Sequence, residues 1–359
     1  MRRLFTVAIC LCWSTLQAQK PIQPTTTTTI GKGGGTTLPP PATIQSSELT
    51  AKVRGNEGTE GLAGQTPTAI SKGMSNATIN GVDDLFHLAL PTTTLGLRLL
   101  NLEHLSAGHD DVDNFFTPRL GHMPVEVIDS RTVRMCEIDS KWGAHICITL
   151  TAVDPHNIDY DFTIWFDDVA LFEPQGYAMV MFANYMPLTH DPGLYLRGIP
   201  SAGTTETWLR WFPPFPGGSI IHPSATTLLV DPAPPINWGY LAGNYKDNLK
   251  SFDYPRYTQP SYCGIQTETN TIWQMMFDRA WSPVDEIRLT MFEWKVKDDG
   301  VGGKVGEPAW DWQYVVHNVV AGQVYGFKAS ASARPRLVSG SIEPECMAEY
   351  TAWLARVQP

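Results

Sequence analysis

Residues 101–114 hold the densest group of side chains that could exchange protons with a substrate: Glu103, His104, His109 and Asp110. A histidine beside carboxylates provides a proton donor and a proton acceptor with different pKa values, and acid–base chemistry on a sugar requires both. We therefore name Glu103, His104 and His109 as candidate catalytic residues.

The same segment allows two other interpretations. Clustered oxygen ligands suit a hard cation, so one alternative is a calcium site formed by Asp110, Asp111, Asp113 and Asn114. An EF-hand loop would need an oxygen ligand and then a glycine where Phe115 and Phe116 stand. The other alternative is a solvent-exposed acidic loop, and the spacing alone leaves all three open.

A second group of candidate residues combines tryptophan with arginine and histidine. Flat indole rings suit the C–H faces of sugar rings and arginine hydrogen-bonds hydroxyl groups, but tryptophan is equally a large core residue. Alternation along a strand places Trp208 and Arg210 on one face. The candidate substrate-binding residues are Trp208, Arg210, Arg279 and Arg288, and His222 is a further candidate for proton exchange. Most of the other tryptophans are expected in the core: Trp211, Trp238, Trp273, Trp281, Trp294, Trp310 and Trp312.

The elements that must position these residues are almost all β-strands. Apolar and polar residues alternate in short segments separated by turn residues. The expected strands are residues 84–90, 95–101, 124–128, 133–139, 144–153, 159–166, 176–185, 194–198, 205–212, 261–267, 271–277, 286–294, 312–317 and 323–331. Only the C-terminus predicts a helix, capped by Ser341, with Pro344 in its first turn and an apolar stripe of Met347, Tyr350, Leu354 and Val357.

So many strands exceed an immunoglobulin-type sandwich. A sheet this wide tends to split into two packed layers. We therefore predict an all-β fold, a large two-layer antiparallel β-sandwich with a C-terminal helix and a disordered N-terminal stalk.

The N-terminal part of the chain has a different composition. Residues 1–18 resemble a signal peptide, with Arg2 and Arg3 before an apolar run that is too short to span a bilayer. Residues 19–82 contain no Phe, Trp or Tyr and predict a disordered Thr/Pro/Gly-rich linker, and residues 83–359 predict a single β-sandwich domain. This organisation predicts a secreted, periplasmic or cell-surface protein; the alternative is an uncleaved N-terminal anchor.

Charge and missing motifs exclude several classes of protein. The formal net charge is −10 and becomes −12 once Arg2 and Arg3 leave with the signal. A nucleic-acid partner would need a basic surface instead. The absence of Gly-x-Ser-x-Gly, His-Glu-x-x-His, P-loop and Rossmann glycine motifs disfavours serine hydrolases of that type, zincin proteases and nucleotide enzymes.

The cysteines predict one disulfide and leave a second undecided. Residues 140–143 suit a hairpin loop, and pairing Asp139 with Ala144 places Cys136 opposite Cys147. Opposed residues of an antiparallel pair lie about 4.5–5.5 Å apart, within disulfide range. The alternative is two buried thiols. Cys263 and Cys346 could form a second bridge, which the sequence does not decide.

The order of strands and aromatic positions resembles the galactose-mutarotase-type β-supersandwich and is similar to uncharacterised secreted bacterial proteins. The segments that carry the resemblance are residues 101–104, 155–162, 176–185, 252–257, 276–279 and 308–311. The resemblance spans about residues 84–331 and implies the fold that aldose epimerases share with many polysaccharide lyases. No catalytic residue of the sugar epimerases carries over to a definite position.

The resulting hypothesis is a secreted carbohydrate-interacting protein, by resemblance a sugar epimerase or a polysaccharide lyase. Proton exchange would then fall to Glu103, His104, His109 or His222, and Arg279 or Arg288 would neutralise a uronate. The alternative is a non-catalytic extracellular binding or structural module on a flexible stalk. The expected partner is a carbohydrate, with no nucleic acid and no membrane span, and the sequence indicates no particular cofactor.

Overall fold

The computed structural model describes residues 40–55, 80–106, 123–137, 142–173, 176–186, 193–200, 203–211, 224–227, 256–278, 285–298, 304–337 and 340–357. The predicted signal peptide and the calcium alternative at residues 110–114 lie outside these residues. The same is true of His109, His222, Arg279, Trp238 and Trp281.

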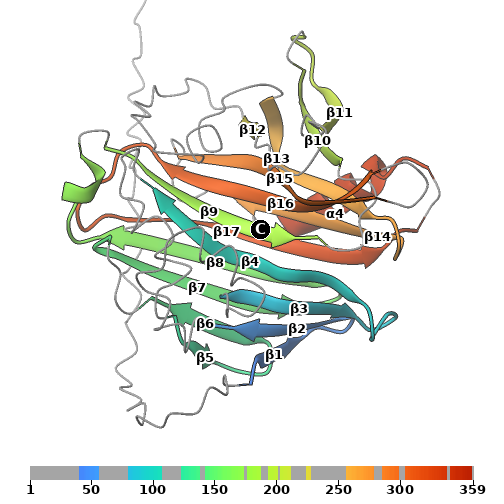
Figure 1. The fold of residues 1–359 in the computed structure, drawn as a ribbon, viewed down its shortest axis with the longest axis horizontal. Coiled ribbons are helices and arrows are strands. Elements are labelled where there is room, and N and C mark those ends of the chain that lie inside the picture. Colours follow the sequence, from blue (N-terminus) through green and yellow to red (C-terminus); the bar gives the residue numbers. More distant parts are fainter. Residues whose placement is uncertain are drawn as a thin grey trace, which may run out of the picture.

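Within the described ranges the chain forms two antiparallel sheets (Figure 1). The first has eight strands, in spatial order β1 (Ala42–Gln45), β2 (Leu49–Arg54), β3 (Gly81–His87), β4 (Thr94–Ser106), β9 (Ala178–Tyr185), β16 (Lys304–Val316), β15 (Glu286–Asp298) and β12 (Ser224–Thr227). The second has nine, in the order β11 (Thr207–Trp211), β10 (Leu194–Ile199), β13 (Arg256–Gln266), β14 (Thr271–Asp278), β17 (Val324–Pro335), β8 (Asn157–Phe166), β7 (Ala144–Val153), β6 (Thr132–Cys136) and β5 (Val125–Val127). A short 3-10 helix, η1 (Ala170–Phe172), and the helix α4 (Glu343–Val357) complete the described elements.

The predicted fold class is confirmed, since two broad antiparallel sheets and a C-terminal helix make up the described chain. The predicted register of the hairpin β6–β7 is also confirmed, with Cys136 opposite Cys147 and a disulfide between them. No helix among the described residues is long and apolar enough to cross a membrane.

The domain begins earlier in the sequence than predicted. Residues 42–54, which the composition assigns to a disordered linker, form β1 and β2 at one edge of the first sheet. Leu49, Ala51 and Val53 alternate with polar residues and are buried. Aliphatic side chains therefore anchor β1 and β2 without an aromatic residue. The prediction of a linker relied on the absence of aromatic residues and overlooked this alternation. The strand β12 was not predicted either.

Aromatic rings from both sheets fill the space between them. Phe182 of β9 stacks on Trp312 of β16 with ring centroids 4.8 Å apart, and Phe162 of β8 meets Phe182 edge-on at 5.0 Å. Gly264 of β13 allows the second sheet to approach Trp310, because a Cβ at position 264 would lie 2.3 Å from that ring. The two sheets are thus joined by close ring packing.

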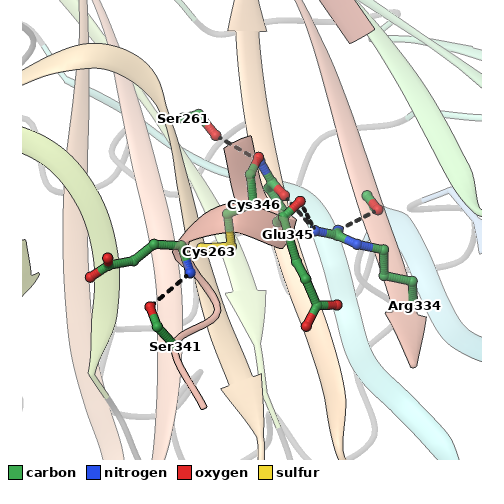
Figure 2. Close-up of a disulfide and its surroundings, with 9 residues drawn as sticks. Ser261, Cys263, Arg334, Ser341, Glu345 and Cys346 are labelled. Atoms are coloured by element: carbon green, nitrogen blue, oxygen red, sulfur yellow. Dashed lines mark hydrogen bonds between the residues drawn. A yellow bond between two sulfur atoms is a disulfide. The ribbon is translucent and has the colours of Figure 1, made fainter. Parts of the chain in front are cut away.

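A disulfide and several hydrogen bonds hold α4 against the second sheet (Figure 2). Cys346 of α4 is bonded to Cys263 of β13, the pairing that the sequence left undecided. The Gln274 amide donates to the carbonyl of Cys346 at 2.8 Å, and Arg334 donates to the carbonyl of Glu345 at 3.1 Å. These contacts come from neighbouring strands of the same sheet face, so they fix the helix in position.

The helix starts as predicted but buries a different stripe. The Ser341 hydroxyl accepts a hydrogen bond from the N–H of Glu343 at 3.3 Å, as expected of a cap. Its buried residues are Cys346 and Trp353, whereas Met347 is only half-buried. The disulfide sets the rotation of the helix about its axis, which the apolar pattern alone did not indicate.

Removing the Cys263–Cys346 bridge should cost more stability than removing the Cys136–Cys147 bridge. The two bridges span sequence separations of 83 and 11 residues, and closing a longer loop restricts the unfolded chain more. We expect C263A/C346A to lower the free energy of unfolding by about 4 kcal/mol and C136A/C147A by about 2–3 kcal/mol. Urea denaturation of both double variants measures this, and equal losses would contradict the loop-length argument.

One imidazole joins the N-terminal strands, the β7–β8 turn and α4. His156 lies in that turn, with Nδ1 3.1 Å from Glu48 of the β1–β2 turn and Nε2 3.1 Å from Glu349 of α4. Burial by itself raises the pKa of Glu349, but hydrogen bonds from His156 and Asn157 and the charge of Arg334 lower it to about 2. An ionised Glu349 is therefore part of this link.

Glu349→Gln should make the stability of the protein depend less on pH in acid. A carboxyl group with a lowered pKa stabilises the fold above its ordinary pKa of 4.5, and this contribution is lost as the pH falls toward 2. Wild type should therefore lose stability more steeply than E349Q across that window. Denaturation midpoints at a series of pH values test this, and parallel profiles would contradict it.

Candidate functional site

The outer face of the first sheet, which points away from the second sheet, carries buried polar side chains from neighbouring strands. Cross-strand partners share a face, and Asn101 of β4 pairs with Ala183 of β9. On the other side of β9, Met181 pairs with Gln313 of β16, which pairs in turn with Arg288 of β15. The buried polar residues of this face are Asn101, Gln313 and Arg288 at 0% exposed, Asp311 at 2% and Glu103 at 6%.

Ring packing determines which residues of β16 belong to this face. Trp310, Trp312 and Tyr314 are part of the core between the sheets. Successive side chains of a strand point to opposite faces. Asp311 and Gln313, which alternate with the rings, therefore face outward.

Strand β4 reaches the same face through irregular backbone. Leu100 has a φ of 56°, and the register with β9 shifts before Asn101 and again between Leu102 and His104. Irregularities of this kind change the direction of side chains along a strand. Leu102 stays in the core, while Glu103 contacts groups of the outer face.

Glu103 and Asp311 form a pair of carboxyl groups, here named the acid pair. The Tyr185 hydroxyl donates a hydrogen bond to Glu103 at 2.9 Å, and Asp311 accepts one from the N–H of Asn184 at 2.8 Å. Burial, and after it the charge of Glu103, raise the pKa of Asp311 well above its ordinary value, against the lowering effect of the Asn184 hydrogen bond. Asp311 thus keeps its proton to a higher pH than an ordinary aspartate. It lies near the Glu103 carboxyl group, so the two could serve as proton donor and proton acceptor.

A second charged group adjoins the acid pair on β15 and β16. Desolvation lowers the pKa of Arg288 to about 10, while the charge of Glu286 opposes this shift. His317 has Nε2 3.2 Å from the Glu286 carboxylate. The Glu286 carboxylate is therefore near enough to Arg288, within the same sheet, to favour its charged form.

The structure brings together two of the predicted site residues, Glu103 and Arg288, on this outer face. His104 also lies in β4, where it pairs with Met181. Their predicted roles in proton exchange and in neutralising a uronate stay predictions.

Trp208 and Arg210 lie elsewhere, on β11 at the edge of the second sheet. Trp208 is half-buried against the cluster around the Cys263–Cys346 disulfide. Arg210 is exposed, with its guanidinium 5.7 Å from the ring centroid of Tyr195. Both residues thus belong to the other sheet from Glu103 and Arg288, and their predicted role in substrate binding stays a prediction.

Tryptophan mostly fills the core in the described part of the chain. Trp273, Trp310 and Trp312 are 0% exposed and belong to the main core cluster. This agrees with the interpretation that most of these rings are structural.

Four members of this face were not predicted from the sequence: Asp311, Tyr185, Asn101 and Gln313. A signal was present in the segment Trp310-Asp311-Trp312-Gln313-Tyr314, where rings and polar residues alternate strictly. Such alternation indicates a strand with one face in an aromatic core and polar groups on the other. It gave no indication of which distant strands would lie beside them.

Among the residues that the structure describes, no three His, Cys, Asp or Glu side chains are grouped so that they could hold a metal ion.

No protein-family model and no curated protein matches this chain. Solved structures of similar fold include a Synechocystis protein, 10% identical with a TM-score of 0.41 over 84% of this chain and 99% of that one. An Escherichia coli protein described as a candidate aldose 1-epimerase is 8% identical, with a TM-score of 0.43 over 82% and 99% of the two chains. An aldose epimerase homologue from C. elegans is 10% identical, with a TM-score of 0.39 over 82% and 99%. At these identities and TM-scores the likeness assigns neither a family, nor site residues, nor an activity to this chain.

The Asp311→Asn variant should gain stability relative to wild type as the pH rises. A carboxyl group whose pKa is raised by burial favours folding below the unfolded value of 3.8, and this contribution is lost as the pH rises toward the folded value. Asparagine cannot ionise in either state. The free energy of unfolding of D311N minus that of wild type should therefore increase as the pH rises above 3.8 in urea denaturation, and a constant difference would contradict a raised pKa of Asp311.

Proposed function

We propose that this chain is a secreted carbohydrate-active protein that interconverts epimers of a neutral sugar by proton transfer. The observation that carries the proposal is the acid pair, in which a buried Asp311 with a raised pKa lies near the Glu103 carboxylate. A carboxyl group whose pKa is raised by burial, beside a second carboxyl group, suits the role of general acid, and the second group suits that of general base.

In the proposed reaction Glu103 accepts the proton of the anomeric hydroxyl while Asp311 donates its proton to the ring oxygen. The bond between the anomeric carbon and the ring oxygen breaks, which gives the open-chain aldehyde. Rotation of the aldehyde and the reverse transfers close the ring with the other configuration and restore both carboxyl groups. Tyr185 acts as a positioning residue, because its hydrogen bond holds the Glu103 carboxylate.

Charge balance favours a neutral sugar over the β-elimination of a uronate that the sequence also suggested. A uronate needs a cation to neutralise its carboxylate. Arg288 already interacts with Glu286, and Glu103 adds a further negative charge to the same face. The other arginine considered for that role, Arg279, lies outside the described residues.

Export from the cytoplasm is part of the proposal. The two disulfides, Cys136–Cys147 and Cys263–Cys346, support it, because disulfides persist mainly in oxidising compartments. A signal peptide at residues 1–18 would supply the route.

Glu103→Gln should remove turnover while the fold is retained. Glutamine keeps the size of the side chain and still accepts a hydrogen bond from Tyr185, but it is no longer a carboxylate base. We expect kcat to fall by a factor of about 100 or more, with an unchanged circular dichroism spectrum. Polarimetry of freshly dissolved α-D-glucose and α-D-galactose follows epimerisation, and ultraviolet absorbance of unsaturated uronides follows β-elimination.

Glu126→Gln is a matched control, because Glu126 lies on β5 in the second sheet and pairs with Arg134. It should keep the wild-type rate. Full turnover by E103Q would refute the proposed reaction. Saturable sugar binding without turnover in wild type would instead favour the non-catalytic binding module.

A further inference from the structure

Two fully buried amides on the outer face of the first sheet lack hydrogen bonds. The side chains of Asn101 and Gln313 are 0% exposed, and neither the oxygen nor the nitrogen of either amide has a partner in the described part of the chain. Native structures leave few buried polar groups unpaired, so each one requires an explanation.

Equally buried amides nearby are fully engaged. Asn80, also 0% exposed, donates to the carbonyl of Leu102 at 3.0 Å and accepts from its N–H at 2.8 Å. Gln274, also 0% exposed, donates to the Ser261 hydroxyl and to the Cys346 carbonyl. Gln266 of β13, also 0% exposed, lacks a partner only for its oxygen. Among the buried amides of the described residues, only Asn101 and Gln313 lack partners for both the oxygen and the nitrogen.

An unpaired buried amide opposes folding, because it gives up hydrogen bonds to water and gains none in return. An apolar side chain of the same size would avoid this loss. Buried polar side chains without hydrogen-bond partners are expected at functional sites, where a ligand can supply the missing partners.

The two amides lie on either side of strand β9. Asn101 of β4 and Gln313 of β16 lie on either side of β9, which contributes Ala183 and Met181 to the same face. Strands two positions apart in a sheet are separated by about 10 Å. A single small ring with a hydrogen bond on each side would match this spacing. Asp311 lies on the same face of β16, two residues before Gln313.

We propose that Asn101 and Gln313, here named the amide pair, bind hydroxyl groups of a neutral polyol and determine its specificity. A side-chain amide offers both donors and acceptors, and a hydroxyl group does the same. Adjacent hydroxyls can satisfy both halves of an amide, whereas a carboxylate satisfies only its donors and an ammonium only its acceptor. The inference rests on the proposed function for the choice of a sugar, but it does not require the acid pair to react.

Stability in the absence of ligand is the first test. Gln313→Met removes an unpaired amide and keeps the length of the side chain, whereas Gln274→Met, the matched control, removes an equally buried amide with its hydrogen bonds. We expect Q313M to raise the melting temperature by about 2–6 °C and Q274M to lower it by a similar amount. Asn101→Leu, with Asn80→Leu as its control, repeats the comparison on the other side of β9.

Sugar binding is the second test. Calorimetric titration with D-galactose, D-glucose and D-glucuronate should detect binding of at least one neutral sugar to wild type. We expect Q313M and N101L each to weaken that binding by tenfold or more, and to lose the rise in melting temperature that the sugar gives wild type. If turnover is present, KM should rise more than kcat falls.

Lower melting temperatures for both Q313M and N101L, comparable with those of their controls, would overturn the proposal. They would mean that ordered water or another internal partner satisfies the amides. Failure of every neutral sugar to bind wild type would also overturn it, even if the variants were stabilised. Weakened binding in Q313M together with full turnover in E103Q would support the amide pair and refute the proposed reaction. The reverse pattern would refute the amide pair alone.

Discussion

Ring packing between the two sheets is the constraint on which the rest of the structure depends. Trp310, Trp312 and Tyr314 of β16 all belong to the core, and Phe182 of β9 stacks on the middle ring. Side chains alternate along a strand, so the residues between these rings must face outward. A shift of the register by one residue would exchange the two faces, which is why the aromatic core also fixes the position of the acid pair.

The polar residues of the outer face oppose the folding that the rings drive. Asp311 is buried with its pKa raised, Arg288 is buried with its pKa lowered, and the amides of Asn101 and Gln313 are unpaired in the described structure. Each of these states costs free energy in the absence of a ligand. A large aromatic core can offset such costs, and stability given up in this way is typical of functional sites.

Both ends of the described chain are held by contacts that involve the same turn. His156, between β7 and β8, contacts Glu48 of the N-terminal strands and Glu349 of α4. The Cys263–Cys346 disulfide adds a covalent tie on the helix side. Strands β1 and β2, whose buried hydrophobic residues are aliphatic, form one edge of the first sheet. Helix α4 packs on the second sheet. These contacts leave the polar outer face of β4, β9, β16 and β15 as a separate region of the molecule.

The sequence by itself determined the two-layer β fold, most of its strands and the hairpin that pairs Cys136 with Cys147. These features follow from alternation and from partners that lie close together along the chain. It also named Glu103 as a candidate, but it indicated neither that Asp311 would be its neighbour nor that Trp208 would lie in the other sheet. Only the tertiary structure decided these points, for a physical reason. Strands β4, β9 and β16 are far apart in the sequence, and their order along the chain does not predict that they pair with one another. The irregular backbone at Leu100 then changes the alternation along β4, so that Asn101 and Glu103 face outward although Leu99 lies in the core.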